Sequence, residues 1–175
     1  FKFDEIKNYL RELISKGIFI IPNTSKTEVE ILQFNNELGS NLPFISENGA
    51  AINGLNLLNS DLPKELILSR EKDNLLNMFK NIVPINLQNK CMWASSMEKK
   101  KQSLIFGLDD KKLNLALNRK YTIPFIFNGT KTEKNQLSKI IRKEGLFLQE
   151  GGRVINLTDK TNKAKALQVF VRFYK

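Results

Sequence analysis

The sequence has no histidine and a single cysteine, Cys91, among its 175 residues. Without histidine a chain has neither a His-based catalytic triad nor the common zinc sites, and one cysteine forms no intramolecular disulfide. There is also no apolar run near the ~20 residues that cross a bilayer, and no basic-then-apolar start typical of a secretory signal. Any chemistry therefore depends on Asp, Glu, Lys, Ser or Thr, and we expect a cytoplasmic protein with no membrane segment.

The chain is basic, with 28 Lys and Arg against 18 Asp and Glu and a net charge of +10. Clustered cations would favour nucleic acid, because they release counterions from phosphates. Only EKKKQ, at 98–102, is a basic run, and elsewhere lysines alternate with acidic residues and asparagines. This pattern is typical of solvated helix faces, so we expect no nucleic-acid partner. A non-catalytic basic module that binds nucleic acid is the alternative from a different class.

Apolar spacing predicts a strand, helix, strand unit near the start. Residues 3–16 have apolar positions three and four apart, which predicts an amphipathic helix ended by Gly17. IFII (18–21) and LPFIS (42–46) are typical of short buried strands, and they flank a helix that Gly39 ends. Because this order of elements builds a parallel sheet, we predict an α/β fold.

The rest of the chain mixes short strands with helices. We predict strands at 65–69, 121–127, 146–150 and 154–157, and helices at 71–82, 109–118, 131–143 and from 162 onward. The pattern between about 52 and 152 indicates an α+β insert. Cys91 and Trp93, in CMWASS, are expected to be packing residues.

Polar residues directly follow the first predicted strand. Thr24, Ser25 and Lys26 lie where the carboxyl edge of an open α/β sheet meets a helix start, a place that binds anions such as phosphate. The plain alternative is that Thr24 or Ser25 only caps the helix.

Glu47, Asn48 and Gly49 follow the second predicted strand, at the same edge of the sheet. Asn-Gly is a frequent tight turn, so a hairpin into AAI is the plain alternative. A carboxylate at the end of a buried strand nevertheless needs a partner or a ligand, which singles out Glu47.

Two further cations lie near the end of the chain. EGGR (150–153) joins two predicted strands, and its glycines can form a hairpin turn while Arg153 can pair with a carboxylate or phosphate. Lys163, in TNKAKAL, lies in the first turn of the last helix, where the helix dipole disfavours a cation unless it faces an anion. A plain surface lysine is the alternative for Lys163.

Five stretches, in this order, resemble the haloacid dehalogenase-like (HAD) phosphatases of the capped subfamily IIB: NTSKTEVEI, LPFISENGAAI, LNLALNRKYTIPFIF, EGGRVINL and NKAKAL. The resemblance is nearest to the branch that hydrolyses mannosyl-3-phosphoglycerate and is weakest at 53–105. It implies a partial, Rossmann-like parallel-sheet core at 1–51 and 153–175. It also implies an inserted cap domain at 52–152 that sets substrate specificity.

Enzymes of this family transfer a phosphoryl group to an aspartate and hydrolyse the aspartyl phosphate, with Mg²⁺ as cofactor and without histidine. By this resemblance, Thr24 hydrogen-bonds the phosphoryl group, and Lys163 balances charge between nucleophile and phosphate. The substrate would be a small phosphorylated sugar-glycerate. Its other contacts are implied for Ser25, Lys26, Glu47, Asn48, Gly49, Arg119, Gly152 and Arg153.

The chain departs from the family pattern in several places. The Asp-x-Asp motif that supplies the nucleophile is absent, and Asp4 does not replace it because no second aspartate lies two residues away. The acidic fourth motif is absent too, so we expect no metal ligands in this chain. Asn162, Ala164 and Ile123 stand where Asp, Gly and Glu are common. We therefore expect a middle portion of such a phosphatase, without activity alone.

Two alternatives remain within this resemblance. A phosphatase for sucrose phosphate or another sugar phosphate is the nearer one, although those relatives tend to have Gly-Arg where this chain has Ser25-Lys26. A natural degenerate protein that has lost its first and last motifs is the other. The sequence predicts neither the sugar of the substrate nor the oligomeric state.

Overall fold

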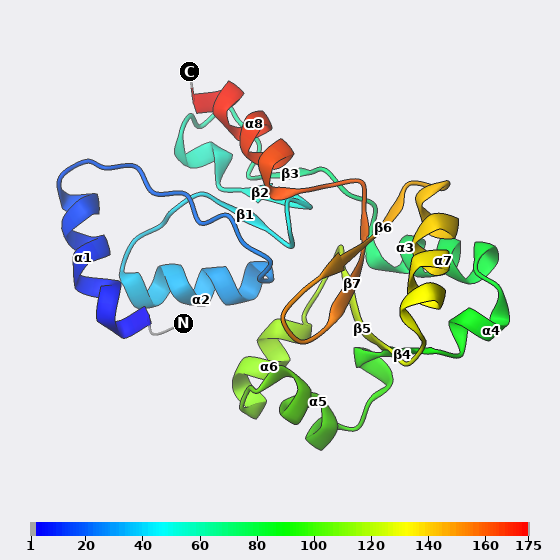
Figure 1. Ribbon diagram of the computed structural model, residues 1–175. Helices are drawn as coiled ribbons and strands as arrows, with labels where there is room; N and C mark the ends of the chain where they lie inside the picture. Colours follow the sequence, from blue (N-terminus) through cyan, green and yellow to red (C-terminus); the bar gives the residue numbers. More distant parts are fainter. Residues whose placement is uncertain (1–2, 175) are drawn as a thin grey trace.

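The computed structural model describes residues 3–174, which form two antiparallel sheets (Figure 1). The first sheet has the order β1-β2-β3, with β1 at Phe44–Ser46, β2 at Ala51–Asn53 and β3 at Glu65–Ile67. The second sheet has the order β4-β5-β7-β6, with β4 at Cys91–Trp93, β5 at Ile123–Phe127, β6 at Leu146–Glu150 and β7 at Ile155–Asp159.

Eight α-helices surround these sheets within the described residues: α1 Phe3–Ser15, α2 Glu28–Leu38, α3 Lys72–Ile82, α4 Ile85–Gln88, α5 Lys99–Phe106, α6 Asp110–Leu117, α7 Lys131–Arg142 and α8 Lys163–Tyr174. The helices and strands predicted from apolar spacing are confirmed to within a few residues, apart from the strand at 18–21. None of the helices between residues 3 and 174 has the length and hydropathy that a bilayer-spanning helix requires.

Each sheet has its own core. α3 and α7 pack Phe79 and Leu137 against Phe125 and Leu157 of the second sheet, and α8 lies on the first sheet (Figure 1). In the first core, Phe170 of α8 joins residues of β1, β2 and the turn after β2. Burying an apolar side chain of this size stabilises a fold by about 1.5–3 kcal/mol, so both packed units contribute to stability.

The predicted strand at 18–21 is wrong, and so is the parallel sheet that depended on it. Among the described residues the only parallel pairing is a single bridge between Asn23 and Ile45. The Ile45 amide donates to the Pro22 carbonyl (2.8 Å), and the Thr24 amide donates to Ile45 (3.1 Å). The next rung toward the N-terminus would need the amides of Pro22 and Pro43, and proline has none. The ladder therefore stops after one bridge.

The sheets do not follow the predicted domain boundaries. β3 lies inside 52–152 but pairs with β2 in the first sheet, and β7 lies after residue 153 but pairs with β5 and β6 in the second. A division by sheets would instead fall in two connections, at 68–71 between β3 and α3 and at 160–162 between β7 and α8. The assignment of the two parts as core and cap stays a prediction.

An ion pair joins the first of these connections to the end of β7, directly before the second. Arg70 donates from its backbone amide (2.9 Å) and its Nε (2.8 Å) to Asp159 Oδ2, and from Nη2 to Oδ1 (2.8 Å). Burial acts to raise the pKa of Asp159, but the hydrogen bonds from Arg70 and from the Lys160 amide outweigh it and hold this pKa below its usual value. The pair therefore stabilises the fold where the chain passes from one sheet to the other.

We expect Asp159→Asn to lower the free energy of unfolding at pH 7 by about 1–3 kcal/mol, because it removes a charged partner from Arg70. Since the pKa of Asp159 is depressed in the folded state, its stabilisation is present above about pH 4 and is lost as the pH falls through the folded-state pKa. Denaturant unfolding from pH 7 to pH 3 should show the variant and the parent converging in acid. Asp61→Asn, at an exposed loop position, is the control. An equal loss in both variants, or a difference independent of pH, would contradict this role.

Candidate active site

Three loop segments that are far apart in the sequence meet at one end of the first sheet: 23–26, 47–49 and 162–163. The amide of Asn48 donates to the Thr24 carbonyl (2.9 Å) and the amide of Glu47 to the Lys26 carbonyl (2.9 Å). Asn23 Nδ2 donates to the carbonyl of Lys163 (3.1 Å). The structure therefore brings together the segments that carry Thr24 and Lys163, the two residues predicted to contact the phosphoryl group.

Gly49 makes this close approach possible. It has a φ of +93°, and a Cβ at this position would overlap the carbonyl of Asn162 at the start of α8. The hairpin into AAI, considered as the plain alternative for the Asn-Gly turn, is present, since β1 pairs antiparallel with β2 on either side of it. The turn is thus both a hairpin connection and a contact surface for the last helix.

The α2 start is not an open anion site. Its N-cap is Thr27, whose hydroxyl accepts from the Glu30 amide while Glu30 accepts from the Thr27 amide (2.9 Å), so the capping role considered for Thr24 or Ser25 belongs to Thr27. The Lys26 ammonium pairs with Glu30 (2.7 Å). Because the cap and two acidic residues occupy the first turn, we expect an anion to contact the 24–26 loop rather than this helix end.

Lys163 is exposed at the first position of α8. Among the described residues no hydrogen bond or ion pair of its ammonium is found, whereas Asn162 Oδ1 accepts from the Lys165 amide (2.9 Å) in the position of a helix cap. The residue that departs from the family's common aspartate therefore has a capping role. The Lys163 ammonium keeps its hydrogen-bonding capacity for a ligand.

Glu47 is buried, with 2% of its surface exposed, and reaches the segment that leads into β5. Its Oε1 accepts from the Lys120 amide (2.8 Å), and its Oε2 accepts from the Tyr121 amide (3.1 Å) and the Thr122 hydroxyl (2.7 Å). The partner that a buried carboxylate requires is therefore the chain itself. These bonds join the end of the first sheet to the start of β5 in the second.

Arg119 lies beside this contact. Its Nη1 donates to the Thr122 hydroxyl (2.8 Å) and the Ser25 carbonyl (3.3 Å), and its Nε donates to the Ala116 carbonyl (3.0 Å). Burial lowers the pKa of the guanidinium, while the nearby charges of Glu47 and Glu30 act in the opposite direction. No hydrogen bond of Nη2 is found among the described residues, so this nitrogen is available to a ligand.

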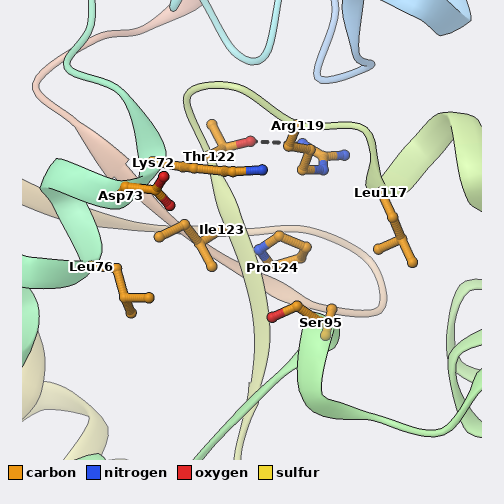
Figure 2. Close-up of a pocket in the computed structure, with 10 residues that line it drawn as sticks. Lys72, Asp73, Leu76, Ser95, Leu117, Arg119, Thr122, Ile123 and Pro124 are labelled. Atoms are coloured by element: carbon orange, nitrogen blue, oxygen red, sulfur yellow. Dashed lines mark hydrogen bonds between the residues drawn. The ribbon is translucent and has the colours of Figure 1, made fainter.

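A cavity of about 270 Å³ lies next to Arg119, between the start of α3, the turn at Ala94–Ser96 and the start of β5. Figure 2 shows Lys72, Asp73 and Ser95 around it, with the Lys72 ammonium pointing toward Arg119. Its apolar wall consists of Leu76, Ala94, Leu117, Ile123 and Pro124. An apolar wall with a few polar groups is typical of a small-molecule site.

The sequence singled out Arg119 but missed Lys72, Asp73 and Thr122. RKYTIPF contains Thr122, yet only its arginine was read as a ligand, because Thr122 falls inside the strand predicted at 121–127 and its partner Glu47 lies 75 residues away. Lys72 and Asp73 begin a helix in the stretch where the resemblance is weakest. Their place in a shared cavity depends on how the helix packs against β5, which local patterns do not show.

The Gly152 and Arg153 turn is not part of this cluster. It connects β6 to β7 as the predicted hairpin, and Arg153 Nη1 donates to the carbonyl of Phe106 at the end of α5. No hydrogen bond between residues 3 and 174 links this turn to the 23–26, 47–49 or 162–163 segments. Its proposed contact with substrate stays a prediction.

The described part of the chain contains no cluster of side chains suited to a metal ion. Among residues 3–174 no three Asp, Glu, Cys or His side chains lie close enough to hold one. Asp73 at the cavity is a lone carboxylate beside two cations, which is a poor environment for Mg²⁺. Mg²⁺ therefore stays a prediction from the resemblance.

Cys91 and Trp93 are packing residues, as predicted. Trp93 lies edge-on to Phe79, with 5.1 Å between ring centroids, and burial raises the pKa of the Cys91 thiol to about 12. At neutral pH the thiol is protonated, which excludes an activated nucleophile at this position.

A family model described as haloacid dehalogenase-like hydrolase matches residues 3–175. A glucosyl-3-phosphoglycerate/mannosyl-3-phosphoglycerate phosphatase of Persephonella marina is 29% identical over 99% of this chain and 66% of its own length. A mannosyl-3-phosphoglycerate phosphatase of Pyrococcus horikoshii is 25% identical over 98% of this chain and 71% of its own. The chain thus spans about two thirds of the length of these curated relatives.

Among solved structures, a haloacid dehalogenase-like hydrolase from Bacteroides thetaiotaomicron superposes with a TM-score of 0.61 at 12% identity. The match covers 95% of this chain and 68% of the other. At this identity the likeness shows the fold alone, and that fold is α/β.

We expect Cys91 to be unreactive toward a thiol reagent in the folded protein. With a pKa near 12 its thiolate fraction at pH 8 is on the order of a thousandfold smaller than that of a free cysteine, and the side chain is also buried. Labelling with Ellman's reagent, before and after unfolding in guanidinium, measures this directly. Rapid labelling of the native protein would show that the β4 region opens.

Proposed function

Because the chain belongs to the haloacid dehalogenase-like hydrolases, we propose that it is the substrate-recognition part of a phosphatase for glycosyl-3-phosphoglycerates, such as mannosyl-3-phosphoglycerate. The observation that carries this proposal is the meeting of the 23–26 and 162–163 segments. A hydroxyl and an ammonium on adjoining loops are the groups expected around a phosphoryl group. In the proposed reaction the Thr24 hydroxyl donates to a phosphoryl oxygen, and the Lys163 ammonium balances the charge beside it.

The cavity supports a substrate with an anionic, hydroxyl-rich part beyond the phosphate. Arg119 and Lys72 supply two cations, Asp73 accepts hydrogen bonds from hydroxyls, and Pro124 and Leu117 offer apolar surface to a sugar ring. Its ~270 Å³ is near the lower limit of ligand sites, so we assign to it one unit of the substrate, either the glycerate or the hexose. The unpartnered Nη2 of Arg119 suits a carboxylate.

Aspartyl-phosphate chemistry and Mg²⁺ come to this proposal from the resemblance and the family. Neither is assigned to described residues, and the activity of the whole protein remains part of the proposal. The test of this chain is therefore ligand binding rather than turnover. Two variants, Lys163→Ala and Arg119→Ala, distinguish recognition of the phosphate end of the substrate from recognition of the remainder.

We expect the chain to bind mannosyl-3-phosphoglycerate, with Lys163→Ala weakening this ligand about 10–100-fold because it removes one charge-assisted contact to phosphate. The same variant should leave the affinity for mannosylglycerate, which lacks the phosphate, unchanged. Arg119→Ala should weaken both ligands. Calorimetric titration of the two ligands against each variant measures these differences.

The control is Lys100→Ala, which removes an equal charge from the exposed face of α5. If Lys163→Ala weakens both ligands equally, Lys163 does not face the phosphate. Titrations with sucrose 6-phosphate and with duplex DNA test the two alternatives, a phosphatase for another sugar phosphate and a module that binds nucleic acid. Tighter binding of sucrose phosphate would replace the proposed substrate. Steeply salt-dependent DNA binding without sugar-phosphate binding would replace the proposed function.

A further inference from the structure

We infer that Glu47 is a positioning residue that holds Arg119 in the cavity wall through the Thr122 hydroxyl, rather than a group that contacts substrate. The meaning of this role for the reaction rests on the proposed function. The hydrogen-bond chain itself does not rest on the proposed function, because it is a property of the folded protein alone. It assigns a different role to a residue that the sequence marked for substrate contact.

Both carboxylate oxygens of Glu47 are already used inside the protein. Oε1 accepts one amide and Oε2 accepts an amide and a hydroxyl, all at 2.7–3.1 Å, and only 2% of the residue is exposed. Oε1 keeps one further acceptor site, but with so little of the side chain exposed a substrate hydroxyl has no access to it. The carboxylate therefore faces the chain and not the cavity.

The Thr122 hydroxyl has a fixed direction between its two neighbours. A guanidinium has no acceptor, so Thr122 must accept from Arg119 Nη1 (2.8 Å). Its single proton is then left for Glu47 Oε2, at 2.7 Å. This order, Arg119 to Thr122 to Glu47, holds the guanidinium plane with Nη2 free for a ligand.

The backbone of the turn is consistent with this positioning role. Glu47 and Asn48 have φ values of 43° and 62°, in the left-handed region that asparagine tolerates and glutamate rarely adopts. Such conformations persist only where the surrounding structure fixes them, and they gather at functional sites. The same turn contacts the 23–26 loop and the start of α8, so one carboxylate links the proposed phosphate contacts to the cavity.

The test compares Thr122→Val, Thr122→Ser and Glu47→Gln, with Glu144→Gln at an exposed position of the α7–β6 connection as the matched control. Valine keeps the shape of threonine but breaks the hydrogen-bond chain, and serine restores the hydroxyl. The readout is the Arg119 Nε–H resonance in a ¹⁵N spectrum, assigned by its loss in Arg119→Lys. In the parent this group donates to the Ala116 carbonyl at 3.0 Å.

We expect exchange of this Nε–H with solvent to be at least about tenfold faster in Thr122→Val and Glu47→Gln, and unchanged in Thr122→Ser and Glu144→Gln. Unchanged exchange in both Thr122→Val and Glu47→Gln, even with a lower melting temperature, would overturn the inference. It would show that Glu47 only stabilises the fold. If Glu47→Gln does not fold, the comparison of Thr122→Val with Thr122→Ser still tests whether the hydrogen-bond chain positions Arg119.

Ligand titration gives a second, separate readout. The dissociation constant for mannosyl-3-phosphoglycerate should rise about tenfold in Thr122→Val and return to the parent value in Thr122→Ser. Absence of binding by the parent would count against the proposed function alone, because the Arg119 resonance still decides the role of Glu47. A binding loss shared by valine and serine would count against the hydroxyl chain.

Discussion

The buried carboxylate of Glu47 lies at the place where the two sheets of this protein meet, and it constrains the segments on both sides. Burying a charge costs several kcal/mol unless hydrogen bonds replace its water, and here two amides and a hydroxyl from residues 120–122 do so. The donors lie directly before β5 of the second sheet, and the acceptor lies directly after β1 of the first. Neither segment can move away without leaving a buried polar group unpaired. The left-handed turn at Glu47 and Asn48, the path into β5 and the orientation of Arg119 all follow from this contact.

The loops that form the proposed site come from distant parts of the chain because one hairpin contacts them all. The turn after β1 lies against the 23–26 segment on one side and the start of α8 on the other, and only glycine at position 49 allows the second contact. The groups proposed to contact phosphate thus share a rigid support. The cavity lies farther along, where Thr122 and Arg119 form part of its lining together with residues of β5 and the neighbouring helices.

Local patterns predicted the parts of this fold that depend on neighbours in sequence. Apolar spacing located α1, α3 and α7, and the β1–β2 hairpin was the plain alternative that Asn-Gly offered. The predicted strand at 18–21 was wrong because apolar composition does not show whether the backbone amides needed for sheet hydrogen bonds are present. Pro22 and Pro43 each lack one of these amides. The partners of Glu47 lie 73 to 75 residues away along the chain. The sequence therefore predicted that this carboxylate needs a partner, but it did not identify the partner. Thr122 was missed for the same reason.

Glu47 shares the joining of the two sheets with other contacts. Tyr121, whose amide donates to Glu47, is also buried against the two alanines where β2 begins. The Arg70–Asp159 pair links the first connection to the end of β7. The two larger cores each lie on one sheet, so the separation between Lys163 and the cavity depends on these contacts between the sheets rather than on either core. A substrate that spans both places would be recognised through a length that these contacts set together.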